Sequence, residues 1–90
     1  YATSKAALAA LTREMASDFG RQGVRVNAIA PGEIDTAILS PGTEEQIVPH
    51  IPLGRLGTPD EVARVIYALT AETSSYVNGA EIHINGGQHV

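Results

Sequence analysis

The sequence predicts an α/β fold that contains two short parallel strands, a helix between them and another helix before them. Three observations support this: an alanine-rich helical stretch opens the chain, apolar runs of strand length lie at 24–30 and 80–84, and a second helical pattern separates those runs. A strand, a crossover helix and a second strand form a βαβ unit, but two strands alone do not make a stable sheet. We therefore expect the 90 residues to be the carboxyl-terminal part of a larger doubly wound parallel sheet.

Residues 2–19 are expected to form the first helix, because they are rich in alanine, the best helix former. Apolar side chains at helical spacing form one stripe along it. Small alanines on other faces let a second backbone come close, so we expect this helix to be covered on more than one side. Gly20 and Gly23 are expected to end it. The stripe consists of Leu8, Leu11, Met15 and Phe19.

Residues 24–30 are predicted to form a buried strand, because β-branched residues alternate there and charges are few. Pro31 and Gly32 close it, and Asn27 is expected to tie neighbouring backbone together. The stretch that follows, 33–57, is irregular and has the length of a functional or disordered loop, and its part at about 37–57 is the expected substrate loop. We expect a lid there, with a short helix opened by the capping-box pattern Thr43-Glu44-Glu45-Gln46.

The second helix has a stronger start signal. Thr58 suits the cap, Pro59 suits the first helical position, and Glu61 completes a capping box. This helix is expected to end near Glu72, and a turn at 78–79 leads into the second strand. The stripe expected to be buried consists of Val62, Val65, Ile66 and Leu69. In the second strand, Ile82 and Ile84 are expected to share one face.

Composition excludes several functions. The net charge of −4 and the scattered Lys and Arg residues argue against a nucleic-acid-binding surface. The chain has no cysteine for disulfides or thiolate metal sites, and no apolar run long enough to span a bilayer. His50, His83 and His89 lack metal-ligand spacing, so no metal site is predicted. Because the chain begins with Tyr and not Met, we expect a fragment or a processed product, and the absence of cysteine fits a protein of the reducing cytoplasm.

Tyr1 and Lys5 are the first candidates for chemistry. Their spacing puts both side chains on one face of the first helix, one turn apart. A nearby ammonium favours the phenolate, and lowering a phenol pKa by ~3 units corresponds to roughly 4 kcal/mol. No surface pair supplies that much, so burial, a cofactor's charge or further hydrogen bonds must contribute. The pair is a candidate general acid/base, although on its own this pattern is more often a packed tyrosine beside a solvated lysine.

Four segments, in order and properly spaced, carry a likeness to a known family. They are Tyr1-Ala2-Thr3-Ser4-Lys5, Val26-Asn27-Ala28-Ile29-Ala30-Pro31-Gly32 with Thr36, Gly54-Arg55-Leu56-Gly57-Thr58-Pro59-Asp60-Glu61-Val62-Ala63, and Asn78-Gly79 through Asn85-Gly86-Gly87. Nearly the whole chain resembles the carboxyl-terminal part of a classical short-chain dehydrogenase/reductase, beginning at that family's catalytic tyrosine. The resemblance implies that residues 1–90 are the carboxyl-terminal segment of a single Rossmann-like domain.

The activity implied by the resemblance is an NAD(P)-dependent oxidoreductase. Hydride would pass between NAD or NADP and a small carbonyl/alcohol substrate. Tyr1 would be the catalytic acid/base at the substrate oxygen, and Lys5 would bond to the nicotinamide ribose and lower the pKa of Tyr1. No metal is implied. The likeness also implies a homodimer or homotetramer.

The resemblance further implies a cofactor-binding turn after the first strand. Pro31 and Gly32 would shape this turn, at the edge where ligands bind in open α/β sheets. The backbone of Ile34 and the hydroxyl of Thr36 would hold the nicotinamide carboxamide or phosphate region. Together with Tyr1 and Lys5, these residues form the expected cofactor site.

Several alternatives stay open. The chain would otherwise be a non-catalytic structural or oligomerisation segment, or belong to an extended-type epimerase or dehydratase. The family's glycine-rich loop, catalytic serine and NAD/NADP selector lie upstream, so we expect the isolated segment to be inactive. Oxoacyl thioesters, sugars, steroids and small alcohols all fit as substrates. Arg55 would meet an anionic substrate or pair with a carboxylate at a subunit contact. The apolar lid residues, which would line the substrate site or pack on the body, are Ile38, Leu39, Ile47, Val48 and Ile51.

Overall fold

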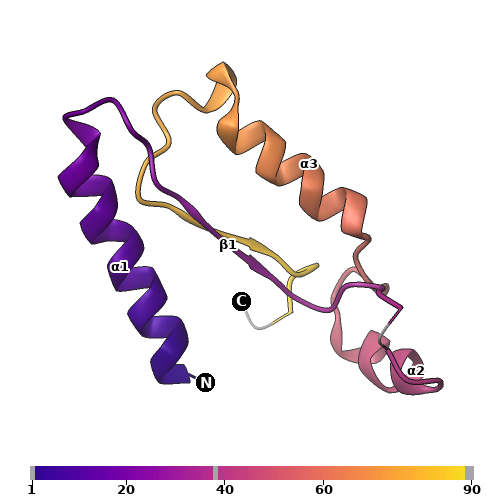
Figure 1. Cartoon of the computed structure of the whole chain (residues 1–90). Helices are drawn as coiled ribbons and strands as arrows, with labels where there is room; N and C mark the ends of the chain where they lie inside the picture. The colour runs from indigo at the N-terminus through magenta and orange to yellow at the C-terminus, as the bar shows by residue number, and fades with distance from the viewer. Residues whose placement is uncertain (1, 38, 89–90) are drawn as a thin grey trace. The chain divides into compact units, whose positions relative to one another are not determined.

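The computed structural model describes residues 2–37 and 39–88 (Figure 1). Helices and strands follow the predicted order. They are α1 (Ala2–Gly20), β1 (Ala28–Pro31), α2 (Thr43–Ile47), η1 (Val48–His50), α3 (Pro59–Thr70), η2 (Glu72–Ser74) and β2 (Glu81–Ile84), where η marks a 3₁₀ turn. The chain divides into two compact units. The first joins the chain up to Ile29 with Ala68–Ile82, and the second joins Ala30–Tyr67 with the chain from His83 onward.

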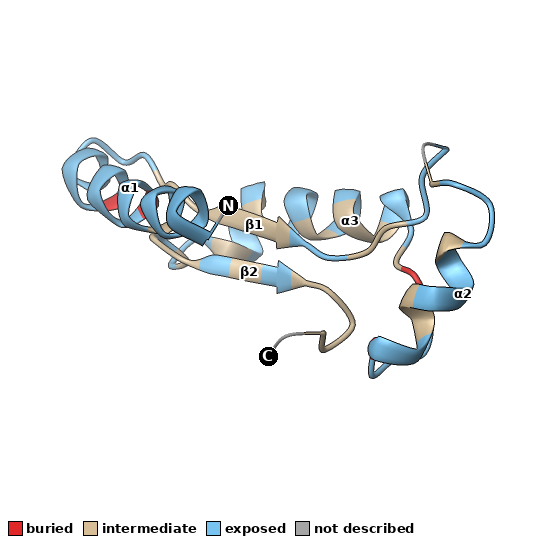
Figure 2. Ribbon diagram, turned by 90° about the horizontal axis from the view of Figure 1, so that it is seen from below, coloured by how far each residue is buried: buried red, intermediate tan, exposed pale blue. Residues whose placement is uncertain are grey.

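β1 and β2 pair in a two-stranded sheet. In the first unit, Ala28 donates its N–H to the carbonyl of Ala80 at 2.9 Å. In the second unit, Gly32 donates its N–H to the carbonyl of Ile84 at 2.9 Å. The paired residues advance together along both strands, so the strands are parallel, as their arrows show in Figure 2. The predicted α/β class, with a helix between two parallel strands, is confirmed.

The first strand is shorter than the predicted 24–30, because β1 begins only at Ala28. Just before β1, the side chain of Asn27 makes hydrogen bonds to the backbone of the segment that leads into β2. Asn27 donates from Nδ2 to the carbonyl of Val77 at 3.0 Å, and its Oδ1 accepts the N–H of Ala80 at 2.9 Å. The predicted role of Asn27, tying neighbouring backbone together, is confirmed. Amide side chains that bond to backbone compete with a regular ladder, which explains the late start of the strand.

In the first unit, α1 packs through small side chains. Thr12 and Ala16 are each 5% exposed. A Cβ added at Gly79 would lie 3.3 Å from the Cβ of Ala16, and Asn78 donates from Nδ2 to the carbonyl of Ala16 at 3.1 Å. Close backbone approach on a small-residue face is therefore confirmed. No second segment of the described residues covers α1: its stripe of Leu8, Leu11, Met15 and Phe19 is exposed. Most of α1 is accordingly pale blue in Figure 2.

The glycine stop predicted for the first helix is confirmed. Gly20 is the last residue of α1, and Gly23 adopts a φ of 80°, in the left-handed region that favours glycine. The N–H groups of Gln22 and Val24 both bond to the carbonyl of Phe19, at 3.0 and 3.2 Å. These bonds satisfy a carbonyl that the helix itself leaves without a partner at its end.

In the second unit, the short helix predicted at 43–46 is present as α2, but its predicted cap is wrong. Gly42, with a φ of 84°, occupies the cap position, and no side chain bonds to the helix start. Thr43 is itself the first helical residue, so its hydroxyl is not at the capping position. The buried side chains of this unit are Ile51 and Leu56, at 4% and 5% exposure.

α3 starts as predicted but ends at Thr70, before the expected Glu72, which opens the 3₁₀ turn η2 instead. The expectation of a buried stripe is wrong, because no residue of α3 is fully buried. Ile66 is 44% exposed, and the other members are half-buried: Val62, Val65 and Leu69. In β2, exposure alternates along the strand, and Ile82 and Ile84 are its half-buried residues, so the prediction that they share one face is confirmed.

Candidate functional site

The candidate catalytic residues lie at the start of the chain. Tyr1 is outside the described residues. Lys5 lies in the second turn of α1 and is exposed. Lys5 belongs to the first unit, whereas the predicted cofactor-binding residues of the turn, Pro31 to Thr36, all belong to the second. The structure therefore brings the residues of the turn together within the second unit, and it describes Lys5 within the first.

The turn after β1 is built on a close backbone approach at Gly32. Its N–H is bonded to the carbonyl of Ile84, the last residue of β2. A Cβ added at Gly32 would lie 2.6 Å from the Cβ and 2.9 Å from the Cα of Asn85. Real Cβ contacts do not come this close, so no larger residue fits without a backbone shift. Pro31, the last residue of β1, is exposed beside this contact.

Ile34 continues the turn and pairs with Gly57 in an isolated parallel bridge. Gly57 donates its N–H to the carbonyl of Glu33 at 3.0 Å and accepts the N–H of Asp35 at 2.8 Å. Both bonds use the residues that flank Ile34. In this parallel pattern, the N–H and C=O of Ile34 itself point away from Gly57. The bridge thus leaves one donor and one acceptor of Ile34 for another partner.

Thr36 is exposed, and its carbonyl accepts the N–H of Leu39 at 3.2 Å. This bond uses the backbone carbonyl of Thr36 and does not involve its side-chain hydroxyl. The turn after β1 therefore holds Gly32, Ile34 and Thr36 on one continuous stretch that is fixed at two points, by Ile84 and by Gly57.

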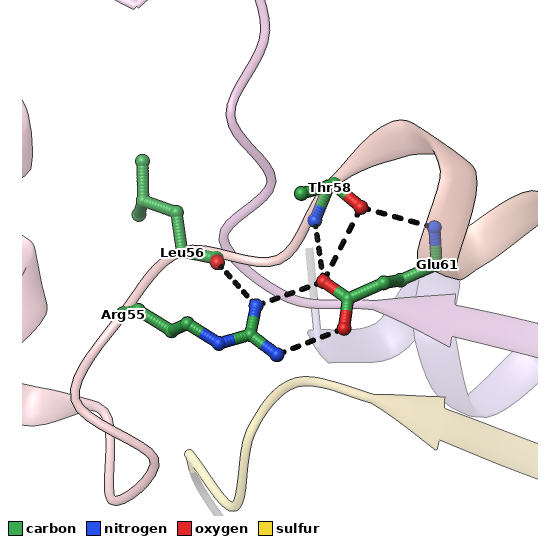
Figure 3. Close-up of polar contacts among 4 residues, drawn as sticks. All are labelled: Arg55, Leu56, Thr58 and Glu61. Atoms are coloured by element: carbon green, nitrogen blue, oxygen red, sulfur yellow. Dashed lines mark hydrogen bonds and ion pairs between the residues drawn. The ribbon is translucent and has the colours of Figure 1, made fainter.

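An ion pair that sequence reasoning missed lies next to this turn (Figure 3). The Arg55 guanidinium donates from both terminal nitrogens to the two oxygens of Glu61, at 2.8 Å each. The predicted capping box is confirmed: Glu61 accepts the N–H of Thr58 at 3.0 Å, and the Thr58 hydroxyl accepts the N–H of Glu61 at 3.1 Å. The box pattern identified Glu61, but nothing in the sequence showed that Arg55 would share its carboxylate. The partner observed for Arg55 is a carboxylate of the same chain, and the two roles left open for it, binding an anionic substrate or pairing with a carboxylate at a subunit contact, stay predictions.

The ion pair shifts the acidity of both partners. Hydrogen bonding to Arg55, then to the Thr58 backbone, lowers the pKa of Glu61 from 4.5 to about 2. The bond to Glu61 raises the pKa of Arg55. The side chains are 55% and 33% exposed, so solvent screens the pair and its contribution to stability is small.

We expect the Glu61 carboxylate to make the free energy of unfolding depend on pH. Its pKa is lowered on folding, so its contribution to stability is complete above pH 4.5 and is lost as the pH falls toward about 2. Urea unfolding of the intact protein and its Glu61→Gln variant should show a difference in the free energy of unfolding that shrinks across this window. The difference between the two proteins cancels the titration of the other carboxylates. A difference that stayed constant with pH would contradict the assignment.

The second unit also holds a cavity of about 510 Å³, bordered by Glu33, Pro52, Leu53, Arg55, Glu61 and Asn85 among others. The lid contributes Pro52 and Leu53 to its wall. The residues expected to give the lid an apolar lining do not border it: Leu39, Ile47 and Val48 are half-buried elsewhere, and Ile51 is buried. Ile38 lies outside the described residues. Packing on the body is therefore the role observed for Ile51.

Two other features of the described residues bear on the class of site. Among residues 2–37 and 39–88, no three His, Cys, Asp or Glu side chains lie close enough to hold a metal ion. Within the same residues, no helix has the length and apolar character that crossing a membrane requires.

Comparison with known proteins gives matches along the whole chain. A family model described as enoyl-(acyl carrier protein) reductase matches residues 1–89. Protein FixR of Bradyrhizobium diazoefficiens is 64% identical over 90 residues, which are all of this chain and 32% of that protein.

Two solved structures show the same fold at similar coverage. A short-chain type dehydrogenase/reductase from Mycobacterium marinum is 40% identical with a TM-score of 0.87, over 99% of this chain and 36% of that one. A 3-oxoacyl-[acyl-carrier protein] reductase with bound NAD from Brucella melitensis is 39% identical with a TM-score of 0.90, over 100% and 33%. The chain thus spans about a third of the relatives it matches. It belongs to the short-chain dehydrogenase/reductase family and corresponds to a carboxyl-terminal part of that family's fold.

Proposed function

We propose that the protein containing this chain is an NAD(P)-dependent oxidoreductase that transfers hydride between a nicotinamide cofactor and a carbonyl/alcohol substrate. The observation that carries the proposal is the match of the whole chain to a reductase with bound NAD. In this proposal, residues 1–90 are the carboxyl-terminal segment of a single Rossmann-like domain. The remaining two thirds of such a domain would supply the phosphate-binding loop and the residue that selects NAD or NADP.

The turn after β1 fits the cofactor for a physical reason. A nicotinamide carboxamide carries both a donor and an acceptor, and the bridge with Gly57 leaves the C=O and N–H of Ile34 for such a partner. The close packing of Gly32 against Asn85 fixes the start of the turn, and Ile34 lies two residues further along it. Pro31, Gly32, Ile34 and the Thr36 hydroxyl would then hold the ring, and the bound nicotinamide would supply or accept the hydride.

The proton would be handled by the first residues of the chain. Tyr1 would donate a proton from its phenol to the substrate oxygen during reduction and take it back during oxidation. Lys5 would bond to the nicotinamide ribose and, as a nearby cation, hold the pKa of Tyr1 below its ordinary value of ~10. Lys5 alone supplies too little of this shift at an exposed position, so the cofactor's own charge would contribute the rest.

The substrate and assembly follow from the relatives. A reductase named for 3-oxoacyl-[acyl-carrier protein] suggests an oxoacyl thioester or a similar small ketone as substrate. We also propose a homodimer or homotetramer, as the family likeness implies. The apolar stripe of α1 is exposed within the described chain, and either the rest of the domain or a second subunit would cover it. A non-catalytic assembly segment, with this stripe as its contact surface, is the second candidate function.

The experiment that separates these candidates is a turnover assay with the intact protein. The absorbance of NADH or NADPH reports its oxidation. We expect this oxidation only when a 3-oxoacyl thioester or a simple ketone is present. A protein that assembles but neither binds NAD(H) or NADP(H) nor oxidises it would contradict the enzymatic proposal and favour the assembly segment.

A further inference from the structure

Glu61 holds the chain on both sides of Gly57 (Figure 3). Its carboxylate accepts two bonds from Arg55, two positions before Gly57, and one from the N–H of Thr58, directly after it. The Thr58 hydroxyl adds a contact to the same oxygen at 3.3 Å. Arg55 also donates to the carbonyl of Leu56 at 3.0 Å, so the peptide that leads into Gly57 is held as well. One side chain thereby fixes the conformation of the 55–58 segment.

Gly57 connects the 55–58 segment to the turn after β1 through two backbone hydrogen bonds. Its N–H and C=O make both bonds of the bridge, to Glu33 at 3.0 Å and from Asp35 at 2.8 Å. The Ile34 side chain also lies close to Gly57, because a Cβ at Gly57 would lie 2.9 Å from Cδ1 of Ile34. The orientation of the Ile34 peptide groups therefore depends on where Gly57 sits, and that position depends on Glu61.

From this chain of contacts we propose that Glu61 is a positioning residue for the nicotinamide carboxamide, acting through Gly57 on the backbone of Ile34. The inference rests on the proposed function, since it needs a dinucleotide at Ile34. Glu61 does not touch the cofactor in this account. Its role is to keep the donor and acceptor of Ile34 aligned before the cofactor arrives, which reduces the ordering cost of binding.

The test compares Glu61→Gln with Asp60→Asn in the intact protein. Glutamine keeps an oxygen for the Thr58 N–H but offers Arg55 only one acceptor, and no charge. Asp60 is the matched control, because it is also an acidic residue in the first turn of α3 and makes none of the bonds shown in Figure 3. Amide hydrogen exchange at Asp35 and Gly57, without dinucleotide, should become about tenfold faster in Glu61→Gln and stay unchanged in Asp60→Asn.

Cofactor binding supplies the second readout. The Kd for NAD(H) or NADP(H), whichever the wild type binds, should rise about tenfold in Glu61→Gln, with kcat at saturating dinucleotide within about twofold of the wild type. Faster exchange with an unchanged Kd would overturn the inference, because Glu61 would then be merely structural. Unchanged exchange would overturn it as well. A wild type that binds neither dinucleotide would instead overturn the proposed function, and the inference with it.

Discussion

Replacing Tyr1 with phenylalanine is expected to reduce kcat/KM for carbonyl reduction by roughly a thousandfold, within the range that general acid catalysis contributes. Phenylalanine keeps the ring but removes the hydroxyl that would give its proton to the substrate oxygen. Dinucleotide affinity should fall much less than turnover, because Tyr1 is only one of the expected cofactor contacts and those of Lys5 and of the turn after β1 remain. The measurement is steady-state turnover of the intact protein, with a fluorescence titration of the dinucleotide beside it.

The chain offers a matched control for this substitution. Tyr76 follows η2, and its side chain is fully exposed. Tyr76→Phe removes the same hydroxyl at a position to which no role is assigned, so its turnover should equal that of the wild type. Equal turnover in Tyr1→Phe and Tyr76→Phe would show that the proton comes from elsewhere and would remove Tyr1 from the mechanism.

Gly32→Ala is expected to destabilise the protein by about 2 kcal/mol or more, as overpacking at a tight contact does. The added methyl would stand 2.6 Å and 2.9 Å from two carbon atoms of Asn85, one of them in the backbone, so a change of rotamer cannot relieve the clash. Gly32 is not among the glycines with positive φ, and the cost therefore comes from space alone. The same shift would disturb the bond from Gly32 to Ile84 and weaken dinucleotide binding at the turn.

Gly20→Ala is the control for that experiment. Gly20 is helical, and the nearest atom to its added methyl is Nδ2 of Asn78 at 3.5 Å, an ordinary contact. Alanine at a helical position is expected to be neutral or stabilising by up to about 1 kcal/mol. Urea unfolding of the intact protein measures both variants. If Gly32→Ala proved as stable as Gly20→Ala, the close approach between the turn and Asn85 would be absent from the folded protein.

The sequence was most informative where structure is decided locally. The capping box at Thr58 and Glu61, the stop at Gly23 and the turn at Gly79 depend on residues within a few positions of each other, and all are found in the structure. The late start of β1 was not predictable in this way, because it depends on Asn27 bonding to Val77, far along the chain. The exposed stripe of α1 is a similar case: periodicity shows that a face is apolar but not which segment covers it.

In the candidate site too, the sequence identified some residues, whereas the roles of others depend on contacts with residues further along the chain. The motif around Pro31 and Gly32 identified the turn, because the family likeness is carried by the residues themselves. Why glycine stands at position 32 became visible only when Asn85 was found against it. The role of Arg55 needed a partner six positions away, and spacing alone could not select Glu61 over another acid. Tyr1 and Lys5 stay a prediction drawn from their spacing and from the family.

The most direct test of the account follows the hydride itself. The intact protein would be given reduced dinucleotide, NADH or NADPH, with deuterium in place of both hydrogens at C4 of the nicotinamide, together with a 3-oxoacyl thioester or a simple ketone. The product alcohol would be examined by mass spectrometry. The account predicts one deuterium on the carbinol carbon of the product. A product without deuterium, or a labelled dinucleotide that stays unreacted beside every carbonyl compound tested, would contradict it.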